Sequence, residues 1–358
     1  MGRTYNFSPG PAMMPLDALH EAQENLVDAY GTGMSVMEMP HRGPEFTAIR
    51  DEAVALFKEL AGIGDEYSVA FIPGGASMQF AMLPLNYLGQ GRSADYVNSG
   101  AWGYKALRQA LAAGDAATAA DTRRSAPARM PRPDECKWSE NAVYAHITTN
   151  ETIAGAQMKE IPEPPAPLAA DMSSDIFAVP RDYTKFALFY AGAQKNLGPA
   201  GLAVVAFRRD FAASASPSVP EILRYSTYID EHSLYNTPPC WCIYMTLLTL
   251  RRLKKEGLET VFARNARKAA KLYAAIDSSG FWRGTADPEF RSVTNVTFRL
   301  PSEELESLFV KQAADLGMTG LRGHRSAGGL RASIYNAFPE EGVDRLAEFM
   351  KEFERKNG

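Results

Sequence analysis

Lys195 is the residue whose surroundings most clearly indicate chemistry. It follows an apolar stretch that ends near Tyr190, and no other charged residue occurs in residues 191–201. A lysine that is withdrawn from water has a depressed pKa, and its neutral amine can attack a carbonyl carbon to form a Schiff base. The alternative is a solvated loop lysine, which is what most lysines are.

Asp171 ends another apolar stretch, one predicted strand before Lys195. The carboxyl ends of parallel strands meet at one edge of a sheet, where such folds bind ligands. An aspartate there can keep a pyridine nitrogen protonated while a lysine bonds an aldehyde carbon, and pyridoxal phosphate requires this pairing. Two alternatives stay open for Asp171: a carboxylate that caps a helix, and a Mg²⁺ site shared with Ser173 and Asp175.

The segment PGGAS, residues 73–77, could hold the phosphate of such a cofactor. It lies between a predicted strand and a predicted helix, where small residues let the backbone approach an anion. It lacks the pattern GxxxxGK[ST], so it is not a nucleotide-binding P-loop. Trp102, further along the chain, could stack on a flat ring or simply belong to the core.

The elements that must position these residues form an α/β pattern. Short apolar runs bounded by glycine and polar turns are typical of strands buried on both faces of a mostly parallel sheet. The predicted strands span residues 68–72, 95–98, 143–147, 168–171, 186–190 and 202–207. Apolar spacing predicts helices that begin at Pro15, at Pro44 and at Cys240, the last with a break near Gly257. The apolar residues predicted to share one face of the first helix are Leu16, Leu19, Leu26 and Val27.

The last part of the chain has a different pattern. Residues 115–140 are predicted to be a surface connection, because they are rich in Arg, Pro and Ala. A compact α+β unit is predicted from strand 293–300, helix 302–316, strand 330–335 and helix 340–355. We therefore predict a large domain, residues 16–260, with a mostly parallel sheet flanked by helices, and a small C-terminal α+β domain, residues 261–358. Residues 1–15 are expected to pack with the small domain.

Composition excludes several classes of protein. The 358 residues are 46% hydrophobic and carry a net charge of −4, which is typical of a globular chain without general attraction to nucleic acid. No run of 18 apolar residues could span a membrane. The three cysteines and five histidines lack the spacing of a zinc site. We expect no metal, no nucleic acid and no membrane partner. A cytoplasmic location is also expected, since the N-terminus lacks the apolar segment of a secretory signal.

Longer motifs carry a resemblance to a known family. They are SVME at 35–38, HRG at 41–43, GGASMQF at 74–80, ADYV at 94–97, NETI at 150–153, residues 190–201, YNTPP at 235–239, GHR at 323–325 and RASIYN at 331–336. Over nearly the whole chain the sequence resembles the phosphoserine aminotransferase family, class V members of the fold-type I pyridoxal-phosphate enzymes. The resemblance implies the α/β fold of those transferases and a homodimer whose active sites are each built from both chains.

The resemblance also implies a role for each motif residue. Lys195 would be the Schiff-base lysine, and Asp171 the partner of the pyridine nitrogen of pyridoxal 5'-phosphate. The other implied cofactor contacts are Trp102 on the ring, Thr152 near its phenolic oxygen, Ala76, Ser77 and Gln194 on the phosphate, and Asn236 and Thr237 from the other subunit. The implied substrate contacts are Arg331 on the α-carboxylate, and His41, Arg42, His324 and Arg325 on the distal anionic group.

The family reaction transfers the amino group of L-glutamate to 3-phosphohydroxypyruvate, which gives O-phospho-L-serine and 2-oxoglutarate. It belongs to serine biosynthesis and proceeds by a ping-pong route through pyridoxamine phosphate. A phosphorylated hydroxythreonine of vitamin B6 biosynthesis is a second substrate class that the resemblance implies. The residues agree independently, because substrates with two anionic ends favour the planar, permanently charged donors of arginine. Arg331 supports this interpretation, since it lies in an apolar strand where an unpaired charge is costly.

Three other functions are less consistent with the residues. A cysteine desulfurase needs a nucleophilic cysteine on a mobile loop, whereas Cys240 and Cys242 lie in a predicted helix. A serine– or alanine–glyoxylate aminotransferase needs no cluster for a distal dianion, and a non-catalytic binding protein need not keep an activated lysine. Two places depart from the family pattern. Pro9 stands where some members have serine, and residues 115–131 look poorly related.

Overall fold

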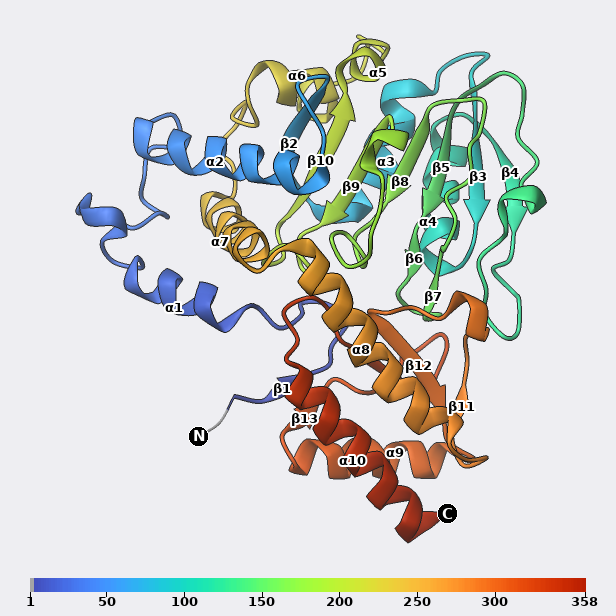
Figure 1. The fold of residues 1–358 in the computed structure, drawn as a ribbon. Helices are drawn as coiled ribbons and strands as arrows, with labels where there is room; N and C mark the ends of the chain where they lie inside the picture. The colour runs from blue at the N-terminus through green and yellow to red at the C-terminus, as the bar shows by residue number, and fades with distance from the viewer. Residues whose placement is uncertain (1–2) are drawn as a thin grey trace.

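The computed structural model describes residues 3–358, and a seven-stranded sheet forms its centre (Figure 1). Its strands are β2 (Tyr67–Pro73), β3 (Ser93–Asn98), β4 (Asp115–Asp121), β5 (Ala142–Thr148), β8 (Leu168–Asp171), β9 (Leu188–Gly192) and β10 (Leu202–Arg208). The strand order is β2-β10-β9-β8-β5-β3-β4. β10 runs antiparallel to both of its neighbours, and the other pairings are parallel. The predicted α/β class with a mostly parallel sheet is confirmed.

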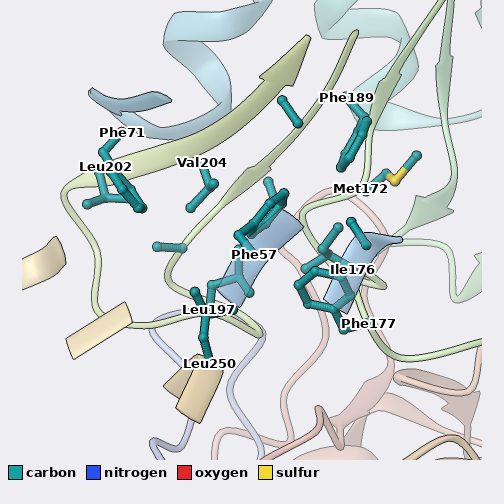
Figure 2. Packing of buried hydrophobic residues seen from close by; sticks show 14 of the residues in the cluster. Phe57, Phe71, Met172, Ile176, Phe177, Phe189, Leu197, Leu202, Val204 and Leu250 are labelled. Atoms are coloured by element: carbon teal, nitrogen blue, oxygen red, sulfur yellow. The ribbon is translucent and has the colours of Figure 1, made fainter. Parts of the chain in front are cut away.

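Buried apolar clusters cover both faces of this sheet. Successive side chains of a strand point to opposite faces, and accordingly Val204 of β10 belongs to one cluster and Val205 to the other. α2 (Pro44–Ala61) and α7 (Cys240–Glu256) pack on one face, and α3 (Gly75–Tyr87) and α4 (Ala101–Ala113) on the other. Figure 2 shows the first cluster, in which Leu197 lies close to Leu250 of α7 and Phe57 of α2. The loop that carries Lys195 is therefore anchored in the core two residues after the lysine.

The C-terminal part of the chain holds a third buried cluster. Its antiparallel sheet has the order β11-β12-β14, formed by β11 (Arg283–Gly284), β12 (Asn295–Arg299) and β14 (Leu330–Ser333). The helices of this part are α8 (Leu258–Asp277), α9 (Glu303–Asp315) and α10 (Glu340–Asn357). β1 (Tyr5–Asn6) pairs in parallel with β13 (Met318–Thr319), and Phe7 and Met13 belong to the same cluster. The domain boundaries after residues 15 and 260 stay predictions.

The remaining elements are short. They are α1 (Leu16–Glu24), α5 (Arg209–Ala213), α6 (Tyr225–Asp230), β6 (Asn150–Glu151) and β7 (Ala156–Gln157). β6 and β7 pair with each other directly after β5, close to the edge where β8 ends. Among residues 3–358, no helix is both long enough and apolar enough to cross a membrane.

The first predicted helix differs from its prediction. Leu16, Leu26 and Val27, expected to share one helical face with Leu19, are exposed, and Leu26 and Val27 lie beyond the end of α1. At the end of the helix, the Asn25 side chain donates to the Glu21 carbonyl at 2.9 Å, and its Oδ1 accepts from the Tyr30 N–H at 3.0 Å. The residues that α1 does bury are Ala18 and Ala22.

Residues 115–121, predicted to be part of a surface connection, form the edge strand β4 instead. The sequence of β4, DAATAAD, contains none of the large β-branched and aromatic residues that are enriched in strands. Parallel hydrogen bonding to β3 decides the structure here, and no local propensity in the sequence indicated it.

A buried lysine ties α8 to the segment that follows β14. Lys268 is 0% exposed, and its Nζ donates to the carbonyl oxygens of Ile334, Tyr335 and Phe338 at 2.9, 2.7 and 3.1 Å. Burial lowers the pKa of this amine well below its usual value. In the same segment, the backbone N–H of Asn336 donates to Asn196 Oδ1 at 3.0 Å. The C-terminal unit is therefore bonded directly to the residue that follows Lys195.

We expect Lys268→Met to lower the free energy of unfolding by about 2–4 kcal/mol, because buried carbonyl oxygens lose their donor. The measurement is urea unfolding of both proteins. Lys271→Met is the matched control, since Lys271 lies one turn later with its ion pairs to Glu340 and Asp344 open to solvent. Equal losses for the two variants would show that the bonds of Lys268 do not stabilise the fold.

Candidate active site

A cavity of about 420 Å³ opens where β8 and β9 end. Asp171 is the last residue of β8, and Gly192 the last of β9, so the parallel pairing of these strands places both at one edge of the sheet. Nine of the residues singled out in the sequence line this cavity: Ala76, Ser77, Trp102, Thr152, Asp171, Gln194, Lys195, His324 and Arg331. The structure thus brings together segments that are far apart in the chain.

Lys195 reaches into this cavity. Its Nζ donates to Thr152 Oγ1 at 2.6 Å and lies 5.3 Å from the centroid of the Trp102 ring. Burial lowers the pKa of the Lys195 ammonium to about 8, and the carboxylates of Asp171 and Glu151 oppose a larger fall. A greater fraction of this amine than of an ordinary lysine is therefore neutral near pH 7, and the neutral amine is the nucleophilic form.

Asp171 is held in place by Ser173. Asp171 Oδ1 accepts from the backbone N–H of Ser173 at 2.9 Å and from its hydroxyl at 2.6 Å, and Ser173 Oγ accepts from the Gly192 N–H at 3.0 Å. Burial raises the pKa of the Asp171 carboxyl, while Lys195 and the bonds from Ser173 oppose that rise. Asp171 Oδ2 has no hydrogen-bond partner among residues 3–358 and is free to bond a group in the cavity.

Asp175 does not join Asp171 in a shared site. Its buried carboxylate pairs with Arg181 at 2.7 Å and accepts from Thr149 and Gln157 at 2.5 and 3.1 Å. In the part of the chain that the structure describes, no group of three His, Cys, Asp or Glu side chains is placed to hold a metal ion. The structure therefore assigns Asp175 to a buried ion pair, and Ser173 to the orientation of Asp171.

The turn before α3 supplies backbone donors to the cavity. Gly74 and Gly75 have φ angles of 99° and 66°, in the left-handed region that glycine adopts at least cost. No side chain caps the first turn of α3, so its N–H groups are available to an anion. A Cβ on Gly192 would lie 2.8 Å from Gln194 Oε1 and 3.3 Å from the Ala76 nitrogen. The absence of a side chain at Gly192 keeps β9 close to this turn.

Glu151 is a site residue that the sequence analysis missed. Its carboxylate is 0% exposed and accepts from Ser99 Oγ, the Trp102 N–H and the Gly103 N–H at 3.1, 3.0 and 2.8 Å. Burial raises the pKa of Glu151, and these three donors oppose the rise. Glu151 therefore fixes the start of α4 and, with it, Trp102, whose buried Nε1 has no hydrogen-bond partner within residues 3–358. The only signal in the sequence was an acidic residue within the NETI motif.

Arg331 and His324 form the wall of the cavity that the C-terminal unit contributes. Arg331 is 4% exposed on β14, and it donates to the Thr152 carbonyl at 3.3 Å. Burial lowers the pKa of its guanidinium. The pKa of His324 is lowered by burial and then by the charges of Arg331, Arg325 and Lys105. Arg325, also predicted to contact substrate, is exposed and does not line the cavity.

Four predicted site residues lie away from this cavity in their own chain: His41, Arg42, Asn236 and Thr237. Arg42 donates to the carbonyl oxygens of Leu234 and Tyr235 at 2.8 and 3.3 Å, so the two segments that carry the four residues lie side by side. His41 Nε2 is buried and finds no hydrogen-bond partner in the part of the chain that the structure describes. Pro9, where the sequence departs from the family pattern, does line the cavity, and its carbonyl accepts from the Tyr335 hydroxyl at 2.7 Å.

The chain is similar to known proteins over almost its whole length. The model of the family "Aminotransferase class-V" matches residues 4–346. Phosphoserine aminotransferase of Desulfosudis oleivorans is 50% identical over 362 residues, with 99% of each chain covered.

The fold is also similar to solved structures of phosphoserine aminotransferases. Phosphoserine aminotransferase from Bacillus circulans subsp. alkalophilus superposes with a TM-score of 0.96 at 48% identity, covering 99% of both chains. The pyridoxal-phosphate-bound phosphoserine aminotransferase of Trichomonas vaginalis superposes with a TM-score of 0.93 at 35% identity, covering 98% of this chain and 100% of that one. The chain therefore belongs to the class V aminotransferases and, within them, to the phosphoserine aminotransferase family.

Proposed function

We propose that this protein transfers the amino group between L-glutamate and 3-phosphohydroxypyruvate, giving O-phospho-L-serine and 2-oxoglutarate, with pyridoxal 5'-phosphate as its cofactor. One observation carries the proposal: a buried amine with a lowered pKa, Lys195, and a buried carboxylate, Asp171, line the same cavity. The names of the relatives support the substrate class, and the relative solved with pyridoxal phosphate supports the cofactor.

Three features of the cavity support the fit of this cofactor. The uncapped N–H groups of α3, with Ser77 and Gln194, would hold its phosphate. The ring would lie against Trp102, and Asp171 Oδ2 would accept a hydrogen bond from the protonated ring nitrogen. When bound, pyridoxal phosphate supplies an aldehyde that takes up amino groups and a ring that withdraws electrons from the bonds of the substrate α-carbon.

Lys195 has two tasks in this scheme. Its Nζ would provide the amine that holds the cofactor, and the same Nζ would move a proton between the substrate α-carbon and the cofactor C4′. A pKa of about 8 suits the second task, because a general base works best when its pKa lies near the working pH. Thr152, bonded to Nζ at 2.6 Å, orients the amine.

Asp171 and Arg331 set the electrostatics and the orientation of the substrate. Asp171 would keep the ring nitrogen protonated, and a protonated ring is the form of this cofactor that withdraws electrons. Arg331 presents a buried guanidinium that suits bidentate binding of the α-carboxylate. His324, which lines the cavity, and its exposed chain neighbour Arg325 would receive the distal carboxylate or phosphate.

The proposal extends to a homodimer with composite sites. Since His41, Arg42, Asn236 and Thr237 do not line the cavity of their own chain, they would serve the cavity of the partner. The bonds from Arg42 to the carbonyls of residues 234 and 235 support this, because they gather the four residues on one surface. A two-fold axis makes such an exchange reciprocal. A cytoplasmic location also stays a prediction.

Amino transfer between glutamate and 3-phosphohydroxypyruvate tests the proposed function directly. We expect the protein to catalyse it, with a preference over unphosphorylated hydroxypyruvate, and we expect Lys195→Ala to lower the rate by at least about 10³-fold. Lys185→Ala is the matched control, because Lys185 pairs with Glu163 at the surface and should leave the rate unchanged. Turnover of Lys195→Ala at a near-normal rate would rule out the role of this lysine.

The lowered pKa of Lys195 predicts a pH profile. In cofactor-free protein, labelling of Lys195 by trace acetic anhydride should rise with pH around a midpoint near 8, as the ammonium loses its proton. Asp171→Asn should move this midpoint to lower pH, because the Asp171 carboxylate stabilises the ammonium. Mass spectrometry of the labelled peptide gives the midpoint. Asp182→Asn, at the surface, is the control. If Asp171→Asn leaves the midpoint unchanged, the Asp171 carboxylate does not influence the pKa of Lys195.

Mixed dimers test the shared sites. Lys195→Ala and Arg42→Ala are each expected to be inactive, and refolding them together in equal amounts should give about half mixed dimers if pairing is random. In each mixed dimer, one site carries both defects and the other carries none, so activity should recover to about a quarter of wild type. If mixed dimers, identified by differential tags, recover no activity, both residues serve the same chain.

A further inference from the structure

A second cavity, of about 630 Å³, lies beside the candidate active site. Its walls come from α4, residues 123–128, β12, the start of β14 and the segment 323–328. We call it the basic cavity, because six cationic side chains line it: Lys105, Arg108, Arg123, Arg124, Arg299 and Arg331. No aspartate or glutamate of residues 3–358 belongs to its lining. This is an uneven distribution of charge in a protein whose net charge is −4.

Two of these cations are held in place by aromatic rings. The Arg123 guanidinium lies 3.9 Å from the centroid of the Tyr104 ring, and Lys105 Nζ lies 4.2 Å from the centroid of the Trp102 ring. Such contacts orient a cation but leave its charge uncompensated. The nearest acidic residue in sequence, Asp121, bonds the Arg123 backbone N–H and the Asn98 side chain and stays outside the lining.

Arg299 pairs with the carboxylates of Glu306 at 2.6 Å and Glu303 at 3.9 Å. No carboxylate of residues 3–358 forms an ion pair with Lys105, Arg108, Arg123 or Arg124. Mutual repulsion of these charges weakens the fold unless an anion or solvent compensates it. An anion between them would therefore be bound favourably.

The basic cavity adjoins the candidate active site but is not part of it. The two cavities share only Ile153 and Arg331 in their linings. Their electrostatics are linked, since the charge of Lys105 contributes to the lowered pKa of His324. None of the roles derived above for cofactor or substrate uses Lys105, Arg108, Arg123 or Arg124.

The chemistry of the walls defines a class of ligand. Four of the cations are arginines other than Arg331, and arginine suits the planar, bidentate recognition of phosphate. Tyr104, Phe298 and Leu330 add apolar surface between them. A volume of about 630 Å³ is within the range of small-molecule sites. We infer that the basic cavity is a second ligand site, and that it binds small phosphorylated compounds with a further anionic group.

Calorimetric titration of the cofactor-loaded enzyme with 3-phosphoglycerate tests this inference. This probe carries a phosphate and a carboxylate but no amino or oxo group, so it binds without reacting. We expect two equivalents per chain in wild type, one in the active site and one in the basic cavity. In the double variant Arg108→Glu/Arg124→Glu, one of the two should bind at least about tenfold more weakly, because it loses two charge-assisted partners.

Arg92→Glu is the matched control, since Arg92 is exposed and lines neither cavity. It should keep both equivalents. The double variant should also keep kcat/KM for both substrates within about twofold, which separates this site from the active site. If charge reversal disturbs folding, Arg108→Gln/Arg124→Gln tests the same contacts. A single equivalent in wild type, or two unweakened equivalents in the double variant, would overturn the inference.

Discussion

One amine and two carboxylates are kept out of water in and next to one cavity, and the surrounding structure satisfies this constraint. Lys195 and Asp171 line the cavity, and Glu151 bonds the backbone of Trp102, which also lines it. A buried charge costs several kcal/mol unless hydrogen bonds or an opposite charge compensate it. Asp171 is compensated by Ser173, Glu151 by the first N–H groups of α4, and Lys195 by Thr152. These partners lie at the ends of different elements. A sheet whose strands end at one edge is the arrangement that brings such ends together.

The antiparallel strand β10 also helps to position Lys195. Because it runs antiparallel to β9, the chain leaves β9 at Gly192, forms the loop with Lys195 and returns at once into the sheet. Leu197 holds this short loop in the core beneath the cavity (Figure 2). The lysine is thus presented by a segment fixed at both ends and in the middle. A group that must meet a cofactor and a substrate in turn benefits from such fixed geometry.

Much of the fold followed from local patterns in the sequence. The apolar runs predicted β5, β8 and β10 to within one or two residues, and Gly257 marked the break between α7 and α8. β4 was missed because its alanines carry no strand signal. The helix predicted to begin at Pro15 is present as α1, but it ends before Leu26 and Val27, which were expected on its apolar face. The structure places Lys195 and Asp171 in one cavity, as their positions at strand ends suggested, although their roles stay proposals. Glu151 was missed because its partners are backbone groups about fifty residues away. The basic cavity could not be predicted either, since its cations come from four separate segments with no common motif.

The hydrogen bond between the Asn336 backbone and the Asn196 side chain couples the evolution of two segments of the chain, the loop that carries Lys195 and the segment after β14. Asn196 follows Lys195, whereas Asn336 lies three residues after the end of β14, the strand that carries Arg331. Losing the Asn196 acceptor would leave a buried N–H without a partner, which costs about 1–3 kcal/mol. A C-terminal unit taken from a distant relative would therefore fit only a loop that offers an acceptor at the matching position. During divergence, the loop and the C-terminal unit are therefore constrained to change together. A chimera that joins the two from different relatives would lose stability wherever this hydrogen bond is not made.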